Sequence, residues 1–302
     1  MAKVLISGGT GAIGQRLADV LRSQGHEVGL LSRSAGKQAE FQTYYWDPEH
    51  NELDIEALKG CEYIIHLAGA GIADKAWTTK RKKEIIDSRV KSTDLLFNKV
   101  KELGTPLKAF VAASAVGYYG QVTSERIFKE KNKAANDFVG KTCFLWEQAS
   151  EQFEELGIRT VRLRIGIVLM EDAGALEQMA RPVRMGLGAV LGSGRQYLPW
   201  IHWKDLVSLF AKAMSDPTMN GPYNAVAPSF VDNAEFTRTL GQVLGKPVWL
   251  PKAPGFVLKA ILGERASLLL QGSRVSAEKV IASGFTFEFP ELKPALADLL
   301  GS

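Results

Sequence analysis

The chain has 302 residues, of which 46% are hydrophobic and 23% are charged, and its formal net charge is +4. Such a chain can bury a sizeable core of its own, and its composition is typical of a globular protein. The mild charge argues against nucleic acid as a partner. The densest basic stretch, residues 80–83, is followed at once by Glu84, a pattern that favours a solvated helix face.

Cysteine usage and hydropathy favour a cytoplasmic protein. Cys61 and Cys143 form neither a disulfide framework nor a metal-ligand motif, so we predict a reducing compartment and no metal site. The first predicted strand begins at Lys3, and we therefore expect no leader peptide. No stretch of about 18 consecutive apolar residues occurs, which predicts that no segment spans a membrane.

Short apolar runs alternate with longer amphipathic segments over the first 170 residues. Near-continuous apolar runs are typical of parallel strands buried on both faces of a sheet. The segments between them have helical spacing, most clearly after Gly14 and from Lys80 to Leu103. The alternation predicts an α/β fold, a Rossmann-type doubly wound parallel sheet. Its predicted strands lie at 4–6, 28–31, 63–67, 110–113 and 161–165.

The pattern loosens beyond Met170, where glycines and prolines indicate a loop-rich region. An apolar segment at 255–273 is expected to be helical. We predict a dinucleotide-binding domain at 1–230, with part of 170–200 contributing to a substrate lobe, and a small C-terminal α+β lobe at 231–302.

The segment that follows the first predicted strand is rich in glycine and opens the first predicted helix. It satisfies the spacing Gly-x-Gly-x-x-Gly in the strand–turn–helix context that this fingerprint requires. Glycine permits a sharp turn and a close approach of a pyrophosphate, and the N–H groups at the helix start favour phosphate. The predicted phosphate-binding residues are Gly8, Thr10, Gly11, Ala12, Ile13 and Gly14.

The second predicted strand ends in Ser32 and Arg33, with Lys37 nearby. A site that prefers NAD usually has an acidic residue here, about 20 residues after the glycines. A guanidinium instead attracts a 2′-phosphate and binds it in bidentate fashion. The sequence therefore predicts NADP(H) as the cofactor, while the alternative is that Arg33 stacks on adenine without selecting between cofactors.

Together with later motifs, the glycine loop resembles the extended short-chain dehydrogenase/reductases, and among them an atypical "epimerase family protein" branch of the NAD-dependent epimerase/dehydratase superfamily. The resemblance spans essentially the whole chain and includes the small C-terminal domain of unknown function of that branch. The segments that carry it are 67–72 (Leu-Ala-Gly-Ala-Gly-Ile), 114–120 (Ser-Ala-Val-Gly-Tyr-Tyr-Gly), 199–206 (Pro-Trp-Ile-His-Trp-Lys-Asp-Leu), 223–228 (Tyr-Asn-Ala-Val-Ala-Pro), 263–266 (Gly-Glu-Arg-Ala), 284–285 (Gly-Phe) and 289–292 (Phe-Pro-Glu-Leu).

The resemblance implies further cofactor contacts along the strand ends and the following helix. They are Leu67, Ala68, Gly69, Glu84, Arg89, Ser114 and Val168. Two simpler interpretations stay open at this point. Leu67 and Ala68 are equally compatible with plain core, and Glu84 and Arg89 with a surface ion pair.

Members of the wider superfamily use a Ser with a Tyr-x-x-x-Lys pair, in which the Lys lowers the Tyr pKa. Ser114 matches the Ser, but Val139 and Cys143 stand where the Tyr and the Lys belong. Tyr118 is our candidate for a replacement acid beside Ser114, and Tyr119 is its neighbour. The alternative is that both tyrosines pack under the loop.

Several other polar residues have weaker signals. His202 and Asp205 are three residues apart, and such a pair more often caps a helix and fixes a loop than catalyses. His26, His50 and His66 have no partner spacing and are expected to be structural. Candidates for binding an anionic substrate are Arg162, Arg164 and Arg195.

Two functions remain open from the sequence. The first is an NADP(H)-dependent oxidoreductase or epimerase-like enzyme that acts on an unidentified small molecule, as a monomer or homodimer. The second is an NADP(H)-binding sensor or partner-binding protein without turnover, which the missing Tyr-Lys pair favours. Fold alone does not decide between them, because chemistry resides in the site.

Overall fold

A computed structural model describes residues 1–34, 36–38 and 41–301. The described residues form a nine-stranded sheet at the centre of the fold. Neighbouring strands from β12 to β4 are all parallel, and β3 adds an antiparallel edge. The order is β12 (Gly221–Ala225), β9 (Arg159–Ile165), β7 (Ala109–Ala115), β6 (Cys61–His66), β1 (Lys3–Ser7), β2 (Glu27–Ser32), β4 (Phe41–Asp47) and β3 (Gly36–Gln38), while β5 (Glu52–Leu53) pairs with β4.

The strand order changes direction between β1 and β6, because the chain winds from β1 outward to β4 and then from β6 outward to β12. This is the switch point at which doubly wound sheets bind ligands. The predicted Rossmann-type fold is confirmed, and all five predicted strands are present.

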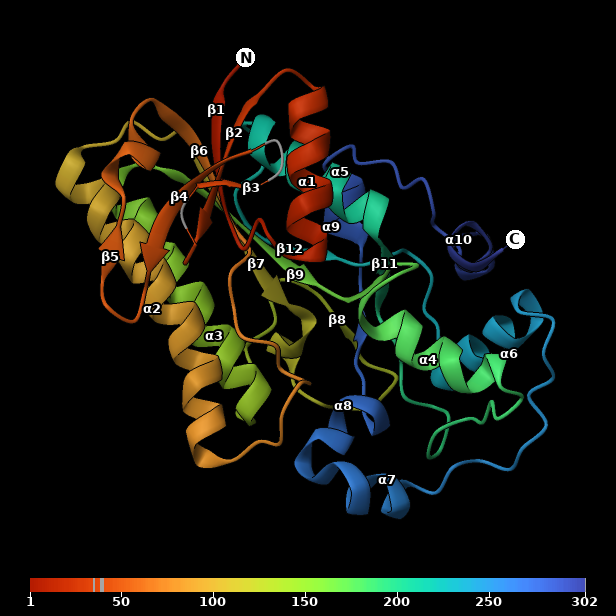
Figure 1. Cartoon of the computed structure of the whole chain (residues 1–302). Helices are drawn as coiled ribbons and strands as arrows, with labels where there is room; N and C mark the ends of the chain where they lie inside the picture. Colours follow the sequence, from red (N-terminus) through yellow and green to blue (C-terminus); the bar gives the residue numbers. More distant parts are fainter. Residues whose placement is uncertain (35, 39–40, 302) are drawn as a thin grey trace.

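Helices cover both faces of the sheet (Figure 1). On one face α1 (Ala12–Ser23) and α5 (Trp203–Ser215) share a core with β1, β2 and β9. On the other, α2 (Thr79–Leu103) and α3 (Phe138–Glu151) pack side by side. Short 3₁₀ turns complete the connections: η1 (Ile55–Leu58), η2 (Val116–Tyr119), η3 (Gln152–Leu156) and η4 (Gly263–Ala266).

Local signals explain where the two long helices begin. The Thr78 hydroxyl accepts a hydrogen bond from the N–H of Arg81, and the Asp137 carboxylate accepts one from the N–H of Gly140. Helix α2 ends at Leu103 and is capped by Gly104, whose φ of 61° lies in the left-handed region that favours glycine.

The smaller lobe draws on two separate parts of the sequence. One apolar cluster joins Leu176 and Trp200 to Phe236, Phe289 and Leu296. Segments near 170–200 and beyond 230 therefore share a core, as the sequence suggested, while the boundary at 230 stays a prediction. Its elements are β10 (Ile167–Leu169), α4 (Gly174–Arg184), β11 (Trp200–His202), α6 (Asn233–Val243) and α10 (Leu292–Leu300).

The remaining C-terminal elements lie outside this apolar cluster, and some of them contact the part of the chain before residue 230. Strand β13 (Arg274–Val275) pairs in parallel with β8 (Ile127–Phe128), and α9 (Glu278–Ala282) packs on β12. Helices α7 (Gly255–Leu262) and α8 (Ser267–Leu270), with η4 between them, confirm the helical expectation over 255–270, whereas 271–273 is not helical. Leu268 of α8 packs against a cluster that includes Ile85 of α2, and Glu264 of η4 is paired with Lys82.

Candidate dinucleotide site and catalytic centre

The register of the central strands places the predicted cofactor residues along one edge. Ser7 at the end of β1 is paired with Leu31 of β2 and with His66 of β6. The segments that continue from these three residues therefore begin side by side at the carboxyl edge of the sheet. They are the glycine loop from Gly8, the Ser32–Arg33 segment and the Leu67–Gly69 segment.

The packing of the glycine loop explains its glycines. Gly8 has a φ of +70°, and a Cβ there would lie 3.0 Å from the backbone N of Ala68. A Cβ at Gly14 would lie 2.3 Å from the carbonyl oxygen of Gly8, so any larger residue would push the loop off the helix start. At Gly11 a Cβ would meet only the Gly8 carbonyl oxygen at 3.3 Å, and Gly11 is exposed.

The beginning of α1 is suited to an anion. Gly11 is its N-cap and, among the described residues, no side chain bonds to the cap and no acidic residue stands in the first turn. The first N–H groups of a helix carry partial positive charge and need an acceptor. The start of α1 therefore has the features that a diphosphate cradle requires, and the phosphate-binding roles of Thr10, Ala12 and Ile13 stay predictions.

The β2 end of this edge carries a cation, Arg33. The Ser32 hydroxyl accepts a hydrogen bond from the N–H of Ser34 at 3.2 Å, which forms a tight turn around the exposed Arg33. Asp47, at the end of neighbouring β4, already accepts hydrogen bonds from the His50 ring and the N–H of Glu49. The Lys37 side chain lies outside the described residues.

Glu84 and Arg89 are not paired with each other. The Glu84 carboxylate accepts a hydrogen bond from Arg81 at 2.6 Å, whereas the Arg89 guanidinium donates to the carbonyl oxygen of Ala70 at 3.0 Å and lies over the Trp146 ring. The simpler interpretation of a Glu84–Arg89 surface ion pair is therefore wrong. Arg89 is largely shielded and covers Gly69, where a Cβ would lie 3.0 Å from its Cζ.

A buried histidine, His66, connects β6 to β1 and α2 by hydrogen bonds at the candidate cofactor edge. His66 Nδ1 is 2.6 Å from the Ser7 hydroxyl, and Nε2 is 3.1 Å from each of the hydroxyls of Ser92 and Thr93. Burial lowers the pKa of His66 to about 3, so the ring is neutral at physiological pH. The structural role expected for His66 is confirmed, but its partners come from β1 and α2 and leave no spacing signal in the sequence.

This burial predicts a pH-dependent stability. The pKa of His66 is about 3 in the folded chain and about 6.5 when unfolded, so the unfolded state binds the extra proton within that window. Stability is then lost as pH falls, and from pH 7 to 5 the His66 contribution is about 2 kcal/mol. In urea titrations at pH 7 and pH 5, we expect the free energy of unfolding of His66→Gln to fall by about 2 kcal/mol less than that of the wild type. A remaining slope is expected from His202, whose pKa burial lowers to about 4.

The catalytic candidate Ser114 belongs to a buried polar network. Its hydroxyl donates to Glu147 Oε1 at 2.7 Å, and Arg164 donates to both carboxylate oxygens of Glu147, each at 2.8 Å. Arg164 also donates to the Tyr119 hydroxyl at 2.9 Å, which in turn donates to Asn224 Oδ1 at 2.6 Å. The network joins β7, α3, β9, η2 and β12 at the carboxyl edge.

The two tyrosines have different surroundings. Tyr119 is 2% exposed, and its hydroxyl is hydrogen-bonded to both Arg164 and Asn224. For Tyr119 the packing alternative is therefore correct. Tyr118 is half-buried, and the Arg164 guanidinium lies 3.5 Å from its ring centroid. Burial raises the pKa of Tyr118, against the opposing effect of Arg164, so this phenol keeps its proton at neutral pH.

The positions of the missing pair are apolar. Val139 and Cys143 lie on α3 in a cluster with Trp77 and Ile85, and Leu268 of α8 packs against it. Burial raises the pKa of Cys143 to about 12, so its thiol is neutral. Tyr118 packs against this cluster. Apolar side chains therefore stand beside Tyr118 where the wider superfamily has a lysine ammonium.

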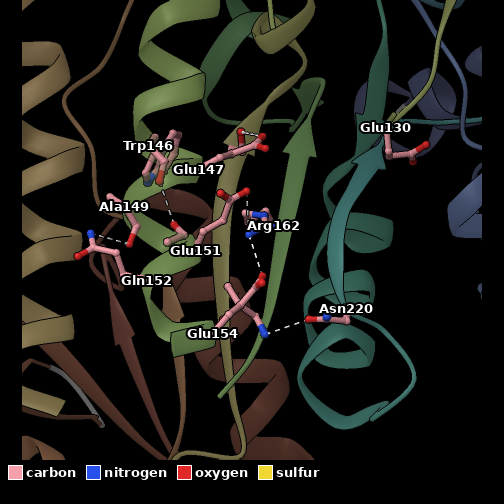
Figure 2. Close-up of polar contacts among 12 residues, drawn as sticks. Glu130, Trp146, Glu147, Ala149, Glu151, Gln152, Glu154, Arg162 and Asn220 are labelled. Carbon is pink, nitrogen blue, oxygen red and sulfur yellow. Dashed lines mark hydrogen bonds and ion pairs between the residues drawn. The ribbon is translucent and has the colours of Figure 1, made fainter. Parts of the chain in front are cut away.

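The candidate anion-binding arginines are already matched by carboxylates in two cases. Arg162 lies between Glu151 and Glu154 (Figure 2). Its guanidinium nitrogen is 3.3 Å from the Glu151 carboxylate and 3.0 Å from that of Glu154. Arg164 is paired with Glu147. The suggestion that Arg162 and Arg164 bind an anionic substrate is therefore corrected to a structural role, whereas Arg195 is exposed.

His202 and Asp205 fix local structure, as expected. His202 Nδ1 accepts a hydrogen bond from the N–H of Lys204 at the start of α5. The Asp205 carboxylate accepts hydrogen bonds from the N–H groups of Glu288 and Phe289, which fixes the segment that leads into α10. Val168, in β10, is half-buried and packs on the main core.

A parallel doubly wound sheet with a glycine-rich phosphate cradle at its switch point defines a dinucleotide-binding protein of the Rossmann class. Residues 4–226 match the NAD dependent epimerase/dehydratase family, and residues 253–299 match a domain of unknown function, DUF1731. The chain belongs to this family and to its epimerase family protein branch, and it has the family's NAD(P)-binding fold.

Full-length relatives share this architecture. The chain is 37% identical to the epimerase family protein SDR39U1 of mouse, over 99% of both chains. It is 36% identical to the epimerase family protein YfhF of Bacillus subtilis, over 98% of this chain and 97% of that one. Human SDR39U1, solved with NADPH, superposes with a TM-score of 0.87 at 34% identity, over 98% of each chain.

Within the described ranges, no helix is long and apolar enough to cross a lipid bilayer. The same residues contain no group of three or more His, Cys, Asp or Glu side chains arranged to hold a metal ion.

Proposed function

We propose that the chain is an NADP(H)-dependent oxidoreductase, working in the direction of reduction on an unidentified small carbonyl compound. The observation that carries the proposal is the position of Arg33. This residue is exposed and directly follows β2, which is paired with β1 and therefore ends beside the glycine loop. A guanidinium there suits a 2′-phosphate, and the solved relative with NADPH supports the same cofactor.

The direction of reaction follows from the acid–base groups at the centre. NADPH supplies a hydride when bound, and reduction of a carbonyl then needs a proton donor at the oxygen. Tyr118 is protonated and is suited to donate. Oxidation of an alcohol would need a base, and the lysine that makes tyrosine a base in the wider superfamily is replaced by buried Cys143.

Calorimetry of the purified chain with NADPH and with NADH tests the cofactor assignment. We expect NADPH to bind at least about tenfold more tightly, a difference of about 1.4 kcal/mol. Equal affinities would remove the basis for the Arg33 assignment, and absence of binding to either would remove the function itself.

Substitution of Tyr118 tests the proposed acid. With the best substrate from a panel of aldehydes and ketones, we expect Tyr118→Phe to lower kcat by about 10²–10⁴, the usual contribution of a general acid. The Kd for NADPH should stay within about twofold, because the variant retains the aromatic ring that packs against Arg164. Unchanged turnover in Tyr118→Phe would exclude Tyr118 as the donor.

A second candidate function is an NADP(H) sensor without turnover. The apolar cluster around Val139 and Cys143 favours it, because Cys143 stands where the wider superfamily has its lysine. Its signature is tight NADPH binding with no NADPH oxidation across the carbonyl panel, whereas the reductase oxidises NADPH in proportion to product formed. A cytoplasmic location and a monomeric or homodimeric state stay predictions.

A further inference from the structure

The direction of one hydrogen bond constrains what Ser114 can do. Glu147 is fixed by two hydrogen bonds from Arg164, and as an ion-paired carboxylate it offers only acceptors. At 2.7 Å from Oε1, the Ser114 oxygen must therefore supply the proton of their hydrogen bond. Both residues are buried, with exposures of 3% and 4%, so water does not compete for this proton.

A serine whose proton is engaged can still accept. A hydroxyl has one donor and two lone pairs, and the bond to Glu147 uses the donor. Ser114 is thus poorly suited to donate to a developing oxyanion. It is instead suited to accept a hydrogen bond from an N–H group.

The position of Ser114 in the sheet indicates which N–H group donates to it. His66 of β6 is paired with Ala112 of β7, so Ser114 lies two residues further toward the carboxyl edge. Arg33 places the adenosine end of the cofactor on the β2 side of β1, and the opposite end must lie toward β6 and β7. The nicotinamide ring carries a carboxamide, whose NH₂ is a donor at this end.

We propose that Ser114 accepts a hydrogen bond from the nicotinamide carboxamide, and that Glu147 is the positioning residue that sets this polarity, itself held by Arg164. This inference rests on the proposed NADP(H) binding. It changes the role of Ser114 from a catalytic donor to a group that orients the ring, and it leaves Tyr118 as the proton donor.

An analogue that lacks the donor tests the proposal directly. The 3-acetylpyridine analogue of NADP⁺ has a methyl group in place of the carboxamide NH₂. We expect the wild-type chain to prefer NADP⁺, and we expect Ser114→Ala to lower the affinity ratio of the two compounds about three- to tenfold, the effect of one hydrogen bond. Glu147→Asp, which withdraws the carboxylate from Ser114, should change the ratio in the same direction.

Three controls make the result specific. Ser150→Ala removes another buried hydroxyl on α3, one that donates to the Trp146 carbonyl oxygen, and should leave the ratio unchanged. Ser114→Thr keeps the hydroxyl and should retain the preference. ADP-ribose 2′-phosphate lacks the nicotinamide and should bind Ser114→Ala as it binds the wild type.

The outcomes separate this inference from the proposed function. If Ser114→Ala weakens both dinucleotides equally, or neither, the carboxamide contact is wrong while NADP(H) binding stands. If the wild-type chain binds neither NADP⁺ nor ADP-ribose 2′-phosphate, the proposed function fails and the inference fails with it.

Discussion

Arg33→Glu is expected to raise the Kd for NADPH about 100-fold, or about 2.7 kcal/mol, and to change the Kd for NADH less than about threefold. The substitution removes a charge-assisted contact to the 2′-phosphate, worth about 1.5–3 kcal/mol, and adds a carboxylate that repels it. NADH has ribose hydroxyls at this place, and a carboxylate is a suitable acceptor for them.

Calorimetric titration of both cofactors measures the effect, and two variants isolate its cause. Arg33→Ala removes the cation without adding repulsion and should show an intermediate loss for NADPH. Arg238→Glu makes the same charge change at an exposed residue of α6 and should leave both affinities unchanged. Parallel losses of NADPH and NADH in Arg33→Glu would mean that Arg33 stacks on adenine without selecting between the cofactors.

The candidate cofactor edge could be located from the sequence because its signals are local. The glycine spacing, the strand before it and the helix after it all fall within residues 3–23, and steric contacts at Gly8 and Gly14 account for the pattern. Arg33 follows at the end of the next strand. Each inference needed only a short stretch of sequence and the rule that parallel strands end at one edge.

The polar networks were not predictable, because their members come from distant elements. His66 contacts residues 59 positions before it and 26 and 27 positions after it, and Arg164 reaches Glu147 across a strand–helix interface. Strand β4 was also missed, since its aromatic sequence, Phe-Gln-Thr-Tyr-Tyr-Trp-Asp, lacks the aliphatic run by which the other central strands were found. Side-chain pairing across a fold leaves no periodicity in one sequence.

Removing either partner of the Glu147–Arg164 pair should destabilise the chain strongly. Both side chains are nearly inaccessible to solvent, so a single substitution leaves an uncompensated buried charge. We expect Glu147→Leu and Arg164→Met each to lower the free energy of unfolding by about 3–5 kcal/mol. The double variant should lose much less than the sum, because an apolar pair of similar volume often replaces a buried ion pair at little cost.

Urea unfolding of the four proteins gives the coupling free energy, and NADP⁺ binding by the double variant separates stability from function. If the pair is only structural, the double variant should fold and still prefer NADP⁺ to the 3-acetylpyridine analogue. If Glu147 sets the polarity of Ser114, the double variant should fold and lose that preference, because the serine proton is then free to turn toward the cofactor. Additive single losses would show that the two charges do not stabilise each other.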